Sequence, residues 1–223
     1  MKQTEYKIGI VGGHIIVTDD RGENLLIDTG SPMSFHSEGR IALCDEVNSV
    51  PTSLMGADAD YVGRKVGAHV GGLLGMDLIG RWGVLIDVPN GKVVFGHGSD
   101  SLTPIPSKSF FGYILAEMEL NGRKATVIID TGAPISYVSP SITEGLESLG
   151  TETDFNPMVP GDTFETPIFE FTASFGGKAF EMRAGHLPSV LGNIVSLLGV
   201  EGVVGMELLK HQPLLIAEGR VWL

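Results

Sequence analysis

Residues 25–35 read LLIDTGSPMSF, and residues 127–137 read VIIDTGAPISY. Both segments contain three apolar residues, Asp-Thr-Gly, a small residue, proline, an apolar residue, serine and an aromatic residue, in that order. The second copy follows the first at an offset of 102 positions. The pattern predicts, twice in one chain, a buried strand that ends at an acidic residue and turns sharply at a glycine.

A second pair of similar segments lies downstream of the first pair. Residues 72–79 read GLLGMDLI and residues 202–209 read GVVGMELL, at an offset of 130 positions. Self-similarity of this kind predicts two halves with the same architecture. Further apolar strand candidates follow each downstream segment, at 84–88 and 92–96 in the first half and at 213–217 and 220–223 in the second.

Each half also opens with a strand, a turn and a second strand. In the first half, strand candidates at 15–18 and 24–27 flank the turn sequence DDRG. In the second half, candidates at 115–120 and 124–129 flank Asn121-Gly122. An Asn-Gly pair between apolar runs is a strong signal for a β-hairpin.

Composition supports an all-β chain with two lobes. Its 31 glycines are about twice the usual share, which favours short strands and tight turns. The segment 97–107, HGSDSLTPIPS, is polar and contains proline, as linkers do. We therefore predict an N-terminal lobe at 1–102 and a C-terminal lobe at 103–223. We expect helix only over 139–149 and for a turn or two within each downstream segment.

The net charge and the absence of a targeting pattern restrict the partners and the cellular location that we expect. The chain has 15 Lys and Arg against 27 Asp and Glu, a net charge of −12, so we expect neither nucleic acid nor an anionic membrane as a partner. Its start, MKQTEYKIGIVGGHIIVTDD, has no signal-peptide pattern, and no stretch approaches the roughly 18 apolar residues of a membrane span. These features predict a cytoplasmic protein. Cys44 is the only cysteine, which excludes a disulfide within the chain.

The sequence predicts no metal and no cofactor. The six histidines show no HExxH spacing, and the glycine-rich segments match neither the phosphate-loop nor the dinucleotide-binding pattern. No serine stands in a GxSxG context. The remaining chemical signal is the pair Asp28 and Asp130.

Asp28 and Asp130 are predicted to meet where the two halves join. Two carboxylates a few ångström apart cannot both ionise, so they share a proton, and one apparent pKa falls while the other rises. One carboxylate then acts as a base on a trapped water while its partner donates a proton to a carbonyl oxygen. Water can attack an amide in this way without a covalent intermediate.

The two Asp-Thr-Gly segments, each followed by an apolar-apolar-Gly segment, resemble those of the pepsin-like and retropepsin-like aspartic proteases. Each half is similar in size to one retropepsin subunit, so the chain resembles a fused retropepsin-like pair. The resemblance implies a two-lobed acid-protease barrel with pseudo-twofold internal duplication. It also implies an aspartic endopeptidase that acts on a peptide or protein substrate, as a monomer.

The resemblance assigns roles by position. Asp28 and Asp130 match the catalytic pair of the family. Thr29 and Thr131 match threonines that hydrogen-bond across the lobe junction. The supporting positions are Thr29, Gly30, Ser31, Thr131, Gly132 and Ala133. Beside the turns, we expect substrate contacts from Met33, Phe35, Ile135 and Tyr137, with packing beneath the cleft in the core as the alternative for these four side chains.

Ser31 and Ala133 occupy the same place in the two motifs and differ chemically. A hydroxyl beside a carboxylate can donate a hydrogen bond to it and favour its ionised form, whereas a methyl group cannot. We therefore expect Asp28 to be the more readily ionised member of the pair.

The family closes a β-hairpin flap over its substrate, and the two halves differ in the room that they leave for one. Only 41 residues separate the two motifs of the first half, against 69 in the second. We expect a stub over 53–66 in the first lobe, and in the second a hairpin near 157–171 with a further one around Gly176-Gly177. A missing lid weakens water exclusion. The alternative is therefore a catalytically weak or inactive peptide-binding or regulatory protein on the same scaffold.

Overall fold

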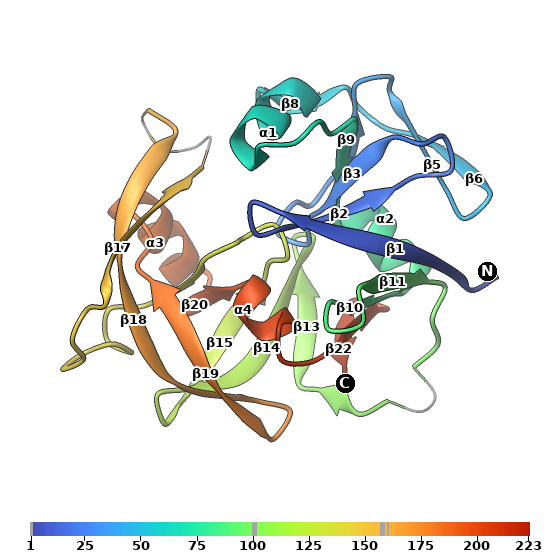
Figure 1. Ribbon diagram of the computed structural model, residues 1–223. Helices are drawn as coiled ribbons and strands as arrows, with labels where there is room; N and C mark the ends of the chain where they lie inside the picture. The colour runs from blue at the N-terminus through green and yellow to red at the C-terminus, as the bar shows by residue number, and fades with distance from the viewer. Residues whose placement is uncertain (1, 100–101, 157–158, 160) are drawn as a thin grey trace.

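The computed structural model describes residues 2–99, 102–156, 159 and 161–223, and strands dominate them (Figure 1). The strands of the first half are β1 (Thr4–Val11), β2 (His14–Thr18), β3 (Asn24–Ile27), β4 (Phe35–His36), β5 (Arg40–Leu43), β6 (Glu46–Ser49), β7 (Ser53–Leu54), β8 (Ala57–Asp58), β9 (Gly72–Leu74), β10 (Val84–Asp87) and β11 (Lys92–Phe95). Those of the second half are β12 (Pro104–Ile105), β13 (Ser107–Phe110), β14 (Tyr113–Leu120), β15 (Arg123–Ile129), β16 (Ser136–Val138), β17 (Gly150–Phe155), β18 (Thr163–Phe175), β19 (Lys178–Gly185), β20 (Gly202–Val204), β21 (Leu214–Ala217) and β22 (Arg220–Trp222). The helices are α1 (Ala59–Val66), α2 (Met76–Trp82), α3 (Ser189–Leu197) and α4 (Met206–Leu209).

The two halves use the same strand pairings. In the first half β3 lies between β2 and β9, with Ile16 opposite Leu26 and Leu26 opposite Leu73. In the second half β15 lies between β14 and β20, with Ile128 between Leu115 and Val203. The antiparallel hairpin and the parallel crossing strand therefore recur in matching register, and the expected strands around both motifs are confirmed.

The last hairpin of the chain joins the halves. Strand β21 pairs with β10, with Val84 opposite Ile216 and Leu85 opposite Leu215. Strand β22 pairs in turn with β12, so the sheet that begins in the first half ends in the second. Leu215 and Ile216 are fully buried. Because burying one such side chain contributes about 1.5–3 kcal/mol, this hairpin holds the two lobes together.

One cluster of buried apolar side chains runs through both lobes. It includes Phe95 from the first half and Phe175 from the second, each with at most 1% of its surface exposed. Two smaller clusters lie on the sides of the β3–β9 and β15–β20 strand pairs, one in each lobe. The core is therefore continuous, and it supports both Asp-Thr-Gly turns.

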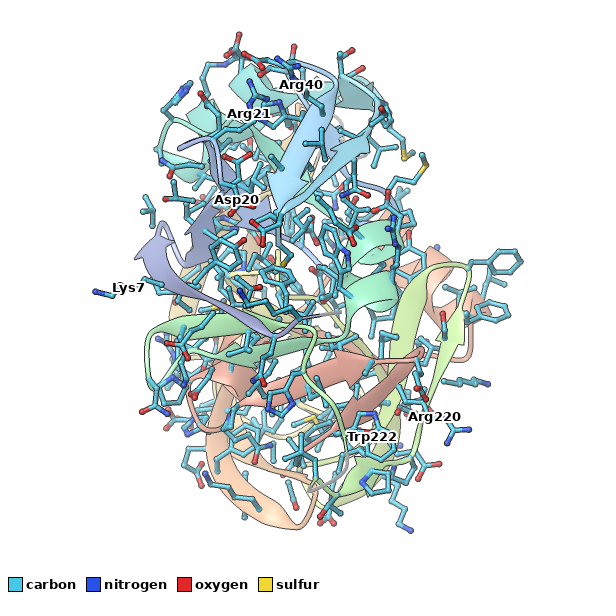
Figure 2. The ribbon with its side chains drawn as sticks, turned by 90° about the vertical axis from the view of Figure 1, so that its right-hand side faces the viewer. Lys7, Asp20, Arg21, Arg40, Arg220 and Trp222 are labelled. Atoms are coloured by element: carbon cyan, nitrogen blue, oxygen red, sulfur yellow. The ribbon has the colours of Figure 1, made fainter. Side chains whose placement is uncertain are left out.

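The turn sequence DDRG is anchored by its two aspartates. Asp19 accepts hydrogen bonds from the backbone N–H groups of Arg21 and Glu23, both at 2.9 Å. Asp20 accepts one from the Tyr6 hydroxyl at 2.7 Å, which ties the turn to β1. Figure 2 shows Arg21 near Arg40 at the outer end of this lobe. Both arginines contact Glu38 in ion pairs at the surface.

Helices follow the predictions only in part. Helices α2 and α4 begin directly after Gly75 and Gly205, as expected. The helix expected over 139–149 is wrong, because that segment forms a series of turns. The Thr143 hydroxyl donates to the carbonyl of Pro140, which competes with helical bonding, and Gly145 has a φ of +81°.

Helices α1 and α3 were not expected from the sequence. Helix α1 begins with Asp58 as its N-cap, whose side chain accepts from the Tyr61 N–H at 2.8 Å. No helix in the described part of the chain has the length and apolar character that crossing a membrane requires.

The halves differ in the hairpins that follow each motif. The first has the short β7–β8 hairpin and α1, which matches the stub expected over 53–66. The second has the long β17–β18 hairpin, paired from Gly150 opposite Ile168 to Phe155 opposite Thr163. Residues 157, 158 and 160 of the expected 157–171 hairpin lie outside the described residues. The hairpin expected around Gly176-Gly177 joins β18 to β19.

The tip of the β13–β14 hairpin carries a strained residue. Phe111 has a φ of +49°, is 80% exposed, and precedes Gly112 in a two-residue turn. Positive φ is unfavourable for a bulky side chain and well tolerated by asparagine. We expect Phe111→Asn to raise the free energy of unfolding by about 0.5–1 kcal/mol. Urea denaturation measures this, with the exposed Lys108→Asn as control; a lower midpoint for Phe111→Asn would contradict it.

Candidate active site

Asp28 and Asp130 occupy equivalent positions in the two lobes. Each follows the last residue of a buried strand, β3 or β15. The Asp28 N–H donates to the Leu74 carbonyl at 3.0 Å, and the Asp130 N–H donates to the Val204 carbonyl at 2.9 Å. The parallel crossing strands β9 and β20 therefore hold the backbone of both acidic residues.

Glycine turns bring the two carboxyl groups together. The Gly30 N–H donates to Asp28 Oδ1 at 2.8 Å, and the Gly132 N–H donates to Asp130 Oδ1 at 2.9 Å. Each carboxyl group also packs against the glycine of the other lobe. A Cβ on Gly30 would lie 2.2 Å from Asp130 Cγ, and one on Gly132 would lie 2.5 Å from Asp28 Cγ. A hydrogen bond joins the two carboxyl groups, so the predicted pair is assembled.

Thr29 and Thr131 lock the two turns to each other. The Thr29 N–H donates to Thr131 Oγ1, and the Thr131 N–H donates to Thr29 Oγ1, both at 3.0 Å. The Thr29 hydroxyl donates to the Ile129 carbonyl at 2.8 Å, and the Thr131 hydroxyl donates to the Ile27 carbonyl at 2.9 Å. Both threonines are fully buried. The structure thus places them in the cross-lobe contact that the resemblance implied.

Gly75 and Gly205, which follow the crossing strands, pack closely against the backbone of the two turns. A Cβ on Gly75 would lie 2.6 Å from the Met33 carbonyl oxygen, and one on Gly205 would lie 2.1 Å from the Ala133 carbonyl oxygen. No larger residue fits at either position without moving the turn. The N–H of each glycine also donates to the serine of the same lobe's motif.

Burial governs the protonation of the pair. Burial raises the pKa of Asp28 well above its ordinary range, and the charge of Asp130 and the hydrogen bond to it raise this pKa further. Burial also raises the pKa of Asp130, while the hydrogen bonds from Asp28 and from the Gly132 N–H lower it. Both carboxyl groups are therefore harder to ionise than an ordinary aspartate, and the pair shares one proton.

The structure corrects the role expected for the Ser31 hydroxyl. It donates to the Met33 carbonyl at 2.8 Å, which leaves no hydroxyl proton for Asp28. The Ser31 hydroxyl therefore does not favour the ionised form of Asp28, and which member of the pair ionises first stays a prediction. Ala133, its counterpart, is buried in the apolar cluster of the second lobe.

The four predicted substrate-contacting residues have different environments. Met33 is 43% exposed, and Ile135 is half-buried. Phe35 is only 2% exposed and packs inside the first lobe, so its assignment as a substrate contact is corrected to a core residue. Tyr137 is 4% exposed within the apolar cluster of the second lobe, and its hydroxyl donates to Asp154, so its assignment as a substrate contact is corrected in the same way. Contact of Met33 and Ile135 with substrate stays a prediction.

Three residues near the pair were missed from the sequence. Tyr113 is half-buried, and burial together with the charges of Asp130 and Asp28 raises its pKa. Its hydroxyl therefore lies near the pair. His14 is buried beside the second turn: burial lowers its pKa, and the nearby backbone of Gly132 raises it. Asp154 is the third. His14 and Tyr113 each follow a glycine at a hairpin tip, so extending the comparison of the two halves towards their N-terminal ends would have identified both residues. No sequence signal identifies Asp154.

Two surface cavities flank α1, apart from the paired carboxylates. One, of about 390 Å³, is lined by α1 and by the loop that follows it, including Arg64 and His69. The other, of about 290 Å³, lies between α1 and Thr52. Neither has a residue of the Asp-Thr-Gly turns in its lining.

Comparisons with known proteins support the fold. No protein-family model matches the chain, and no curated protein matches it. Among solved structures, basic 7S globulin from soybean matches with a TM-score of 0.52 and 10% identity, over 100% of this chain and 96% of that chain. The protease of simian foamy virus (mac) matches 41% of this chain and 86% of that chain, with a TM-score of 0.31 and 16% identity, too low for any argument.

The match to the globulin covers the whole chain, and its low identity limits it to the fold. Together with the sheets described above, it shows the expected fold class: all-β, with the two lobes of the pepsin-like, acid-protease architecture. It says nothing about catalysis.

Proposed function

We propose that the protein is an aspartic endopeptidase, which hydrolyses peptide bonds with a water activated between Asp28 and Asp130. The observation that supports this proposal is the assembly of two carboxyl groups from opposite lobes, each packed against the glycine of the other lobe's turn. Because one chain supplies both carboxylates, a monomer suffices for the reaction.

The chemistry follows from the protonation of the pair. Ionised Asp130 accepts a proton from the water, whose oxygen attacks the carbonyl carbon of the peptide. Protonated Asp28 donates its proton to the carbonyl oxygen, so a neutral gem-diol forms. Asp130 then returns its proton to the leaving nitrogen, a diol hydroxyl returns a proton to Asp28, and the carbon–nitrogen bond breaks. The pair ends in its starting state, and one water has been consumed.

The substrate in this proposal is an extended peptide segment that lies between the lobes. Met33 of the first lobe and Ile135 of the second offer apolar surface beside the two turns. The β17–β18 hairpin of the second lobe serves as the lid, since the first lobe supplies only the short β7–β8 hairpin. Water exclusion under such a lid strengthens the electrostatic interactions of the pair.

A peptide with a statine-type hydroxyl tests the function directly. Such a group mimics the gem-diol and requires a pair that holds one proton. We expect it to bind about tenfold or more tightly at acidic pH than at a pH where both carboxylates are ionised, measured by calorimetry. In Asp28→Asn this pH dependence should disappear. A protein that binds peptides, shows no preference for the mimic and cleaves nothing would instead be the peptide-binding or regulatory alternative.

A further inference from the structure

The two lobes match closely at the turns and differ around the second one. Phe35 and Tyr137 are equivalent, since Phe35 lies opposite Leu73 on β9 and Tyr137 lies opposite Val203 on β20. The first lobe therefore has a phenyl ring where the second has a phenol. The hydroxyl of this phenol creates a contact that the first lobe lacks.

Tyr137 joins the second motif to the β17–β18 hairpin. Its hydroxyl donates to Asp154 Oδ2, and the Phe155 N–H donates to Asp154 Oδ1 at 2.8 Å. Asp154 is half-buried near the end of β17. Both of its oxygens are thus held, one by the strand that follows the Asp130 turn and the other by its own hairpin.

His14 approaches the same turn from the first lobe. It is 3% exposed and follows Gly13, whose Cβ, if present, would lie 2.7 Å from Cβ of Pro134. Burial lowers the pKa of His14, while the charge of Asp154 and the backbone of Gly132 raise it, so the ring lies close to both groups. Among the residues that the structure describes, its Nδ1 has no hydrogen-bond partner.

The β17–β18 hairpin is also fastened to the first lobe. Lys65 of α1 forms an ion pair with Asp162 at the hairpin's end. The Lys65 ammonium lies 5.8 Å from the centre of the Phe155 ring, and that ring lies 6.1 Å from the ring of His14. Figure 1 shows the hairpin rising beside the end of α1. Asp154 is therefore held at the point where hairpin, first lobe and second turn meet.

From this arrangement we infer that Asp154 is a positioning residue of the site. Through Tyr137 it ties the β17–β18 hairpin to the strand behind Asp130, and it places a third negative charge beside the paired carboxylates. This inference rests on the proposed peptidase function. Its two parts, the tether and the charge, can be tested separately.

The charge of Asp154 has a defined effect on the pair. The groups facing Asp154 are the Tyr137 hydroxyl of β16, the His14 ring of β2, Glu152 of β17 and Asp130. Burial raises the pKa of Asp154, while the Tyr137 hydrogen bond lowers it. Ionised Asp154 raises the pKa of Asp130. Removing this charge should make the pair lose its shared proton at lower pH.

The test compares Asp154→Asn with Glu152→Gln, a control that removes a charge two residues away on the same strand. In Asp154→Asn, we expect the alkaline limb of the kcat/KM profile to move to lower pH. At the pH where the wild type keeps half of its maximal value, the variant should keep about a quarter or less. Glu152→Gln should keep the wild-type limb. An identical limb in both variants overturns the inference about charge.

Tyr137→Phe tests the tether, because it keeps the Asp154 carboxyl group and introduces the ring that the first lobe already has. We expect the maximal kcat/KM to fall about threefold to tenfold. The wild-type rate in this variant overturns the positioning role. Circular dichroism confirms that each variant is folded.

An NMR titration separates this inference from the proposed function. The carboxyl-carbon shift of Asp130 reports the ionisation of the pair whether or not the protein cleaves peptides. A lower midpoint in Asp154→Asn than in Glu152→Gln supports the placement of the charge even if no substrate is cleaved. Equal midpoints in an active enzyme overturn the inference and leave the peptidase function intact.

Discussion

Asp28→Asn and Asp130→Asn should each lower kcat/KM for peptide hydrolysis by about a thousandfold or more. Each substitution keeps the shape of the side chain and removes either the proton donor or the base, groups that commonly contribute factors of about 10²–10⁴ each. A fluorogenic peptide assay measures the loss. Asp60→Asn, at an exposed position in α1, is the matched control and should keep the wild-type rate. Wild-type cleavage by either variant of the pair would refute the catalytic assignment.

Asp28→Asn should also change how the free energy of unfolding depends on pH. The pKa of Asp28 is raised by folding, so the folded chain binds more protons than the unfolded chain above the ordinary aspartate range. The stabilising contribution of this group is thus present below its unfolded pKa and is lost as pH rises towards its folded pKa. Asp28→Asn should flatten this fall in the free energy of unfolding, as measured by urea denaturation at several pH values.

Thr131→Val should lower the free energy of unfolding by about 2–4 kcal/mol. The substitution keeps the volume and leaves two buried partners unpaired, the Thr29 N–H and the Ile27 carbonyl, at about 1–3 kcal/mol each. Activity should fall as well, because the second turn is no longer locked to the first. Chemical denaturation and the peptide assay provide the two measurements.

Thr172→Val is the matched control for Thr131→Val. The Thr172 hydroxyl is exposed and donates to Glu181 Oε1 at 3.0 Å, so its loss leaves no buried group without a partner. We expect a change within about 0.5 kcal/mol for the control. Equal losses in the two variants would show that the cross-lobe hydrogen bonds add no particular stability.

The strands and the paired carboxylates could be predicted because their signals are local and occur twice. Apolar runs that end at Asp28 and Asp130, each followed by a glycine, constrain the backbone within a few residues. The register of the crossing strands then follows, since Gly75 and Gly205 leave room for a close backbone approach. The error over 139–149 has a local cause too, a threonine side chain that competes for backbone hydrogen bonds.

The amino-acid sequence by itself determined the two-lobed β-architecture and the identity of the acidic pair, because hydrophobic alternation and glycine turns act between near neighbours. Only the tertiary structure decided that the Ser31 hydroxyl bonds within its own turn, that Phe35 belongs to the core, and that Asp154 and His14 face the second turn. These properties depend on burial and on contacts between residues far apart in the chain, and their strength is set by the three-dimensional surroundings of each charge.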